Sequence, residues 1–132
     1  MTDVNNPLSA LIQDDSAELD LELLTGLLKD YIKFSKDGTI STLRPFYEKD
    51  NQQKILIMLL AYKAKSILFE GEAEGVAPSV LISTQIMAEG SVKSTLKNLL
   101  EKSREIKKDN NGGYYIPAYM LADVEKRLKD GA

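Results

Sequence analysis

One long apolar segment in the middle of the chain constrains the fold more than any other feature. Residues 55–62 are apolar without interruption, and apolar side chains recur up to Phe69. Asp50, with Gln53 three residues later, has the pattern of a helix N-cap. A helix that is apolar almost all round must be buried on most sides, so the sequence predicts a central helix around which the chain packs. The uninterrupted run is far shorter than the roughly 18–20 residues that a membrane span needs.

Residues 1–15 carry little pattern. Asn6 followed by Pro7 is compatible with a short helical turn that reaches Ile12, and the same segment can equally fray. The segment has acidic residues where a signal peptide would need a basic stretch before an apolar run. No export signal is therefore visible, and the absence of cysteine agrees with the cytoplasmic location that we expect.

The segment 16–47 is expected to hold one helix and one short strand. Asp15, with Glu18 three residues later, resembles a capping box, and the apolar residues that follow have helical spacing. These features predict a helix over 17–35. Residues 39–43 then alternate polar and apolar side chains, as a short half-buried strand does.

Two further helices are predicted after the central one. The loop 70–75 is rich in glutamate and glycine and suits a solvated connection. Pro78 is well placed as the first residue of a short helix that ends near Gln85. A longer helix is expected over 89–103. At about 100° per residue, its inner face is formed by Val92, Leu96, Leu99 and Ser103, and its outer face by Gly90, Ser94, Lys97, Asn98 and Glu101.

The last part of the chain predicts a β-hairpin and a final helix. Residues 104–108 and 113–117 have the composition of two short strands. The turn between them, 109–112, contains Asp, Asn and Gly residues, which tolerate the positive φ of a tight turn. Residues 118–130 have an apolar stripe and basic side chains near the C-terminal end, which favours a helix.

The amino-acid composition excludes most classes of catalytic site. The chain has no histidine and no cysteine, so it lacks Ser-His-Asp and Cys-His nucleophiles, Cys/His zinc sites, His- or Cys-ligated haem and iron–sulfur clusters. It also lacks a Gly-rich phosphate loop and a paired-carboxylate motif, and we expect neither an enzyme nor a cofactor. Glu70, Glu72 and Glu74 could gather a hard cation, but they lack the oxygen spacing of a calcium loop and are interpreted as a solvated surface.

The order of the predicted elements carries a family resemblance. Residues 50–117 give a long buried helix, a short helix, a turn, an amphipathic helix and a hairpin with a Gly-rich tip. With Ser91–Leu100 followed by Ile106–Ile116, this order resembles the winged helix-turn-helix of small prokaryotic transcription regulators. The resemblance covers about the second half of the chain. It implies a winged helix-turn-helix over 48–132, packed with 16–47, in a fold that is mainly α with a small β-component and additional N- and C-terminal helices.

The resemblance also implies that the protein is a DNA-binding transcription regulator. The helix 89–103 would lie in the major groove of double-stranded DNA, and the wing 104–117 on the backbone or in the minor groove. The matched contact residues are Ser91, Lys93, Ser94, Lys97 and Asn98 in the helix, and Lys107, Lys108, Asn110 and Asn111 in the wing. Lysines supply charge to phosphates, and Asn and Ser can hydrogen-bond bases or phosphate oxygens. The outward face of the helix has no arginine, so the commonest bidentate contact to guanine is missing.

The charge of the chain is distributed unevenly. The whole sequence has 17 basic and 20 acidic residues, a net charge of −3. Residues 91–108 hold six basic residues against two acidic ones, a local charge of +4, which leaves −7 for the remainder. A local basic segment of this kind supports a nucleic-acid partner in spite of the acidic total.

Three alternatives stay open. The basic helix and wing could be the ordinary solvated surface of a winged-helix adaptor that binds protein and not DNA. The apolar faces of helices 17–35 and 118–130 could cover the domain within one chain, or pair across a two-fold axis in a homodimer that reads two half-sites. Tyr114, Tyr115 and Tyr119 could stack on unpaired bases, although alternating wing residues more commonly pack on the helices beneath.

Overall fold

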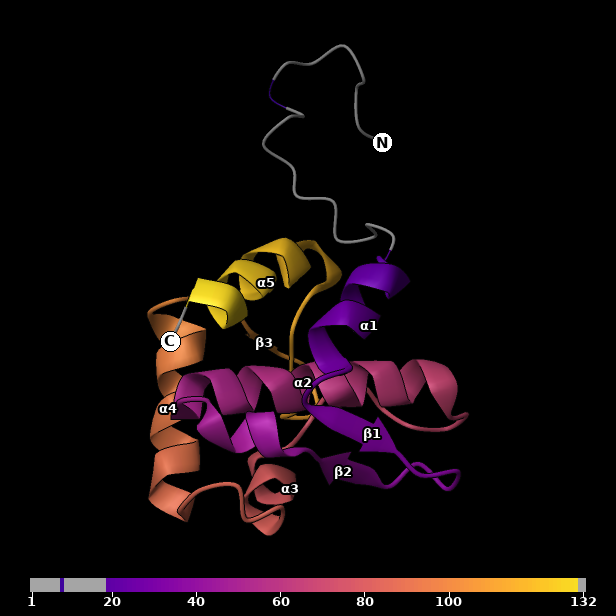
Figure 1. Ribbon diagram of the computed structural model, residues 1–132. Coiled ribbons are helices and arrows are strands. Elements are labelled where there is room, and N and C mark those ends of the chain that lie inside the picture. The colour runs from indigo at the N-terminus through magenta and orange to yellow at the C-terminus, as the bar shows by residue number, and fades with distance from the viewer. Residues whose placement is uncertain (1–7, 9–18, 131–132) are drawn as a thin grey trace.

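The computed structural model describes residue 8 and residues 19–130, and these form helices and two small hairpins (Figure 1). The helices are α1 (Leu21–Leu28), α2 (Asn51–Leu68), α3 (Pro78–Ser83), α4 (Glu89–Glu101) and α5 (Leu121–Asp130). The antiparallel hairpins pair β1 (Ile32–Phe34) with β2 (Ile40–Thr42), and β3 (Lys107–Lys108) with β4 (Tyr114–Tyr115). Two 3-10 turns, η2 (Arg44–Glu48) and η3 (Ala118–Met120), precede α2 and α5. The expected mainly helical fold with a small β-component is confirmed.

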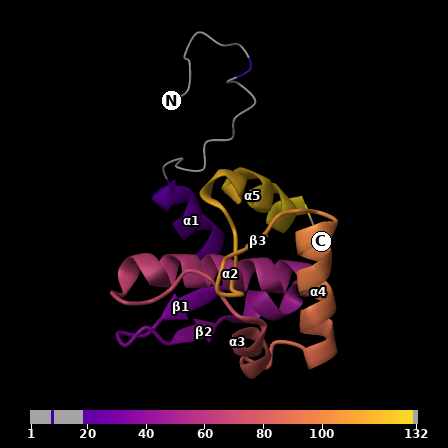
Figure 2. The ribbon, with the colours of Figure 1, turned by 180° about the vertical axis from the view of Figure 1, so that it is seen from behind.

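Helix α2 is the centre of the core, as the sequence predicts. Its capping box is complete, because Gln53 N donates to Asp50 Oδ1 at 2.8 Å and Asp50 N donates to Gln53 Oε1 at 3.1 Å. Residues 55–61 are all buried. Figures 1 and 2 show α1 and α5 on one side of α2, the β1–β2 hairpin and α3 on the other, and α4 across its N-terminal half. In the part of the chain that is described, no helix is long and apolar enough to cross a membrane.

The predicted helix over 17–35 is wrong in its second half. Helix α1 begins after Asp20, whose side chain accepts a hydrogen bond from Leu23 N, and it ends at Leu28. Ile32 is buried as a strand residue that pairs with Thr42. An apolar residue four positions after Leu28 fits a helix and a buried strand equally well, so periodicity could not separate the two. The expected capping box at Asp15 and Glu18, and the segment 1–15, lie outside the described residues.

The first hairpin is closed by a short polar turn. Asp37 Oδ1 accepts a hydrogen bond from Thr39 N at 3.0 Å, and this donor lowers the pKa of the Asp37 carboxyl below its ordinary value. Gly38 has a φ of +91°, which only glycine adopts without strain. The resulting strand β2 confirms the strand predicted over 39–43.

Helix α5 docks on the N-terminal end of α2. Its buried side chains are Leu121, Val124 and Leu128. Gln53 Nε2 donates to the Arg127 carbonyl at 3.2 Å, and Lys49 Nζ donates to the Leu128 carbonyl at 3.0 Å. Because α1 contacts both α2 and α5, one core extends from Leu24 to Leu128. The predicted helix over 118–130 therefore divides into the 3-10 turn η3 and α5.

Candidate nucleic-acid interface

Helix α4 presents the polar face that the sequence predicts. Its buried residues pack toward α2 and α3 and are Val92, Thr95, Leu96 and Leu99. On the other side, Lys93, Ser94 and Lys97 are exposed, and Ser91 and Asn98 are half-buried at the edges of that face. Ser103 was expected on the inner face but is exposed, because α4 ends at Glu101.

The lysines of α4 differ in their surroundings. Lys93 Nζ lies 3.5 Å from Glu89 Oε1, and about two-thirds of each side chain is exposed. Such exposed pairs are worth about 0–1 kcal/mol, so a phosphate could displace Glu89 at little cost. Lys97 enters no ion pair with any described residue. Lys97 is thus the cation on α4 that is most available to an anionic partner.

The connection between α3 and α4 is short and contains a left-handed residue. Gln85 has a φ of +58°, a conformation that glycine usually supplies at the end of a helix. Ile86, immediately after it, is buried, and the next helix begins at Glu89. The chain therefore turns between the two helices without a glycine, and α3 contacts α4.

The strands of the second hairpin are shorter than predicted. Residues 104–106 were expected to be strand, but Arg104 has a φ of +57°, and Glu105 N donates to the Leu99 carbonyl at 3.1 Å. This hydrogen bond folds the chain back onto the end of α4 before β3 begins. Pairing is limited to Lys107 with Tyr115 and Lys108 with Tyr114.

The two wing lysines leave their strand on opposite faces, as successive strand residues do. Lys107 Nζ lies 5.2 Å from the centre of the Tyr119 ring, on the side where a hollow of about 290 Å³ is lined by Tyr115, Tyr119, Lys63 and Glu74. Lys108 Nζ lies 5.7 Å from the centre of the Tyr114 ring. Lys107 therefore lines this hollow, whereas the side chain of Lys108 lies on the other face of β3.

The tip of the wing is ordered by Asp109. Its Oδ1 atom accepts hydrogen bonds from Asn111 N and Gly113 N, both at 2.8 Å, and Gly112 has a φ of +82°. These contacts confirm the predicted turn. They leave Asn110 and Asn111 exposed at its end. The tyrosines behind the turn, Tyr114, Tyr115 and Tyr119, are half-buried, and Tyr114 packs against the core.

The base of the wing rests on a segment that sequence reasoning did not identify. Val76, between α2 and α3, forms an antiparallel bridge with Tyr114, with N–O distances of 2.9 and 2.8 Å between the two backbones. Gly75 and Gly113 approach so closely that a Cβ on Gly113 would lie 2.8 Å from the Gly75 carbonyl carbon. A glycine in each of two segments about 40 residues apart was the available sequence signal, but a single sequence does not show that they meet.

We expect Gly113→Ala to destabilise the protein by about 2 kcal/mol, because the new methyl group meets backbone that cannot move without breaking the Val76 bridge. The measurement is urea unfolding followed by circular dichroism. Gly90→Ala is the matched control, since its Cβ would meet nothing within 4 Å and alanine favours a helix by about 0.5–1 kcal/mol. Equal effects of the two substitutions would contradict the close approach of Gly75 and Gly113.

Two ion pairs flank the wing. The Lys63 ammonium donates to Glu74, and Arg127 Nη1 lies 2.5 Å from Oε1 of the buried Glu105. The interpretation of Glu74 as a solvated loop residue is therefore wrong, because it reaches back to a lysine of α2 that is only 7% exposed. Glu72 lies 3.9 Å from Lys65, so these two acids of the loop approach different lysines.

No family model, curated protein or solved structure matches the chain. The residues of the site offer exposed ammonium, hydroxyl and amide groups on α4 and on the wing, all of which can donate hydrogen bonds to phosphate oxygens.

Proposed function

We propose that the protein binds double-stranded DNA through α4 and the β3–β4 hairpin, as a winged helix-turn-helix transcription regulator. The observation that carries the proposal is the order α2, Val76 bridge, α3, α4, hairpin, in which Val76, before α3, pairs with Tyr114 of the hairpin. Apart from the Val76 bridge, which the sequence did not indicate, this is the order of elements that the family resemblance implies. By that resemblance, α4 would be the helix that enters the major groove.

The surface of α4 supports a polar partner. Lys93, Ser94 and Lys97 are exposed along one face, and none of the large exposed hydrophobic side chains among the described residues belongs to α4. A protein-binding adaptor would more commonly offer an apolar patch there. The alternative of a winged-helix adaptor is therefore less well supported at α4 than a phosphate-binding role.

The proposal assigns different tasks to the contact residues. Lys93, Lys97 and Lys108 would neutralise phosphates, and Ser91, Ser94 and Asn98 would reach base edges or phosphate oxygens. Asn110 and Asn111 would meet the backbone or the minor groove at the wing tip. Lys107 would contribute less directly, because it lines the hollow that also contains Lys63 and Glu74. Without arginine on α4, we expect modest discrimination between sequences.

The first test is a salt titration of duplex binding, measured by fluorescence anisotropy between 50 and 300 mM KCl. We expect log Kd to rise linearly with log salt, and Lys97→Ala to reduce the slope by about 0.9, which corresponds to about eightfold weaker binding at 0.1 M salt. Lys36→Ala, an exposed lysine in the β1–β2 hairpin, is the control and should leave the slope unchanged. Undetectable or salt-independent binding would reject DNA binding and favour the adaptor.

A further inference from the structure

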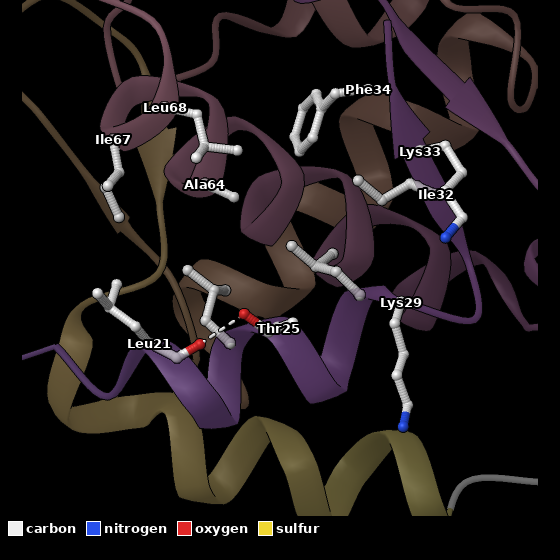
Figure 3. Close-up of a pocket in the computed structure, with 11 residues that line it drawn as sticks. Leu21, Thr25, Lys29, Ile32, Lys33, Phe34, Ala64, Ile67 and Leu68 are labelled. Carbon is white, nitrogen blue, oxygen red and sulfur yellow. Dashed lines mark hydrogen bonds between the residues drawn. The ribbon is translucent and has the colours of Figure 1, made fainter.

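An apolar groove lies on the side of the molecule formed by α1, β1 and the C-terminal end of α2. It has a volume of about 360 Å³, and its floor is formed by Leu24, Leu28, Ile32 and Ala64. Figure 3 shows Leu21 of α1 and Ile67 and Leu68 of α2 on its rim. The groove is on different elements from α4 and the wing.

Exposed apolar side chains are concentrated at this groove. Among the described residues, six large hydrophobic side chains are exposed, and three of them, Leu21, Ile67 and Leu68, are on its rim. Leu68 is 64% exposed and Leu21 is 56% exposed. Single exposed leucines are ordinary, but a cluster of them around a hollow marks a surface that another molecule covers.

We propose that a second copy of this chain covers the groove, with the two α1 helices antiparallel across a two-fold axis. A two-fold contact uses the same surface twice, so it requires a ridge and a hollow on one patch. The groove offers both, because Leu21 projects at one end of α1 and the hollow continues past the other end, beside Ile32 and Phe34. In the antiparallel arrangement, Leu21 of each copy lies toward the hollow of the other.

The charges of α1 fit this arrangement and no parallel one. Glu22 lies in the first turn of α1, and Lys29 directly follows its last turn. Neither forms an ion pair with any residue that the structure describes. An antiparallel pair of α1 helices places Glu22 opposite the partner's Lys29 twice, whereas a parallel pair would place like charges together.

The middle of α1 permits a close approach. The midpoint between Glu22 and Lys29 falls between Thr25 and Gly26, which are both exposed. A Cβ at Gly26 would meet no atom of residue 8 or residues 19–130 within 4 Å, so packing against this part of the chain does not require glycine there. Glycine within a helix lowers its stability relative to alanine, and a crossing point of two helices is a place where its small size is useful.

The test is the mass of the full chain in sedimentation velocity between 1 and 100 μM, in the absence of DNA. We expect a dimer of 29.4 kDa, twice the 14.7 kDa of one chain. Glu22→Lys and Lys29→Glu should each raise the dimer Kd by about tenfold or more, because each creates two like-charge contacts. The double variant E22K/K29E should restore the wild-type Kd, since it exchanges the charges without changing their pairing.

Two further variants complete the test. Gly26→Arg should give a monomer whose thermal unfolding remains cooperative, because a Cβ at this position meets no atom of the described residues within 4 Å. Lys36→Glu, an exposed charge reversal in the β1–β2 hairpin, should leave the dimer intact. A monomeric wild type at 100 μM, or single reversals without effect, or a double variant that does not recover, would each overturn the proposal. The readout does not involve DNA, so the outcome is independent of the proposed function.

Discussion

Replacing Glu74 by alanine is expected to lower the free energy of unfolding by about 3 kcal/mol. The Lys63 side chain is 7% exposed, and its ammonium donates to the Glu74 carboxylate. Removing one partner of a buried pair leaves an uncompensated charge, which costs about 3–5 kcal/mol in proteins. We expect the lower end of that range because Glu74 itself is 35% exposed. Lys107 lines the same hollow, and its positive charge would repel the Lys63 ammonium once Glu74 is removed.

Replacing the other partner of the ion pair, Lys63, should change the free energy of unfolding only slightly. Lys63→Met keeps the length of the side chain and removes the buried charge, while the Glu74 carboxylate is exposed enough to turn toward water. We therefore expect a change of less than about 1 kcal/mol. In the double variant, methionine at position 63 should recover most of the loss caused by Glu74→Ala, because no buried charge is then left without a partner.

Urea denaturation at neutral pH measures all three variants. The expected order of stability is wild type and Lys63→Met first, then the double variant, then Glu74→Ala. If Glu74→Ala and Lys63→Met prove equally mild, the ion pair is a surface contact and the loop 70–75 is solvated, as the sequence alone indicated. That result would also weaken the view that this pair supports the base of the wing.

The central part of the fold could be predicted because its signals are local. Asp50 and Gln53 form the complete capping box that their spacing indicates, and the apolar run after them is buried. Pro78 begins α3, and the inner face of α4 is correct at Val92, Leu96 and Leu99. In each case, residues within one or two helical turns determine the outcome.

The errors arose where a backbone hydrogen bond outside the regular helical pattern decides the structure. Ile32 continues the helical spacing of α1, but its backbone pairs with Thr42 after the turn at Gly38, and that pairing ends the helix. Arg104 sits in a sequence compatible with a strand, yet the Glu105 hydrogen bond to Leu99 holds the chain at the end of α4. The spacing of apolar residues does not show which other segment will pair with a given backbone group.

The local features of the candidate site could be predicted, whereas its tertiary contacts could not. The exposed lysines of α4 and the turn at Asp109 follow from local spacing. The support beneath the wing was missed, because it joins Val76 to Tyr114 and Glu74 to Lys63 across the tertiary structure. The opposite orientation of Lys107 and Lys108 was available from the alternation of strand residues, but only once the length of β3 was known.

Reversing the charge of Lys97 and Lys108 is expected to weaken duplex binding more than any neutral substitution. Both side chains are exposed, and neither enters an ion pair with the residues that the structure describes. One phosphate contact is worth about eightfold in affinity between 1 M and 0.1 M salt. Lysine to glutamate removes one such contact and adds one repulsive charge, so each single reversal should weaken binding by roughly 60-fold at 0.1 M salt.

The double variant K97E/K108E tests whether α4 and the wing hold the same duplex. Lys97 and Lys108 lie on different elements, so their effects on log Kd should add, to a loss of roughly 4,000-fold, if each contacts a separate phosphate. Lys36→Glu controls for the change in net charge, which long-range repulsion alone would also produce. If Lys108→Glu behaves like Lys36→Glu while Lys97→Glu retains its full effect, only α4 contacts the DNA. In that case the second hairpin serves as structural support within the chain, because β4 contacts α2 and its Tyr114 backbone is hydrogen-bonded to Val76.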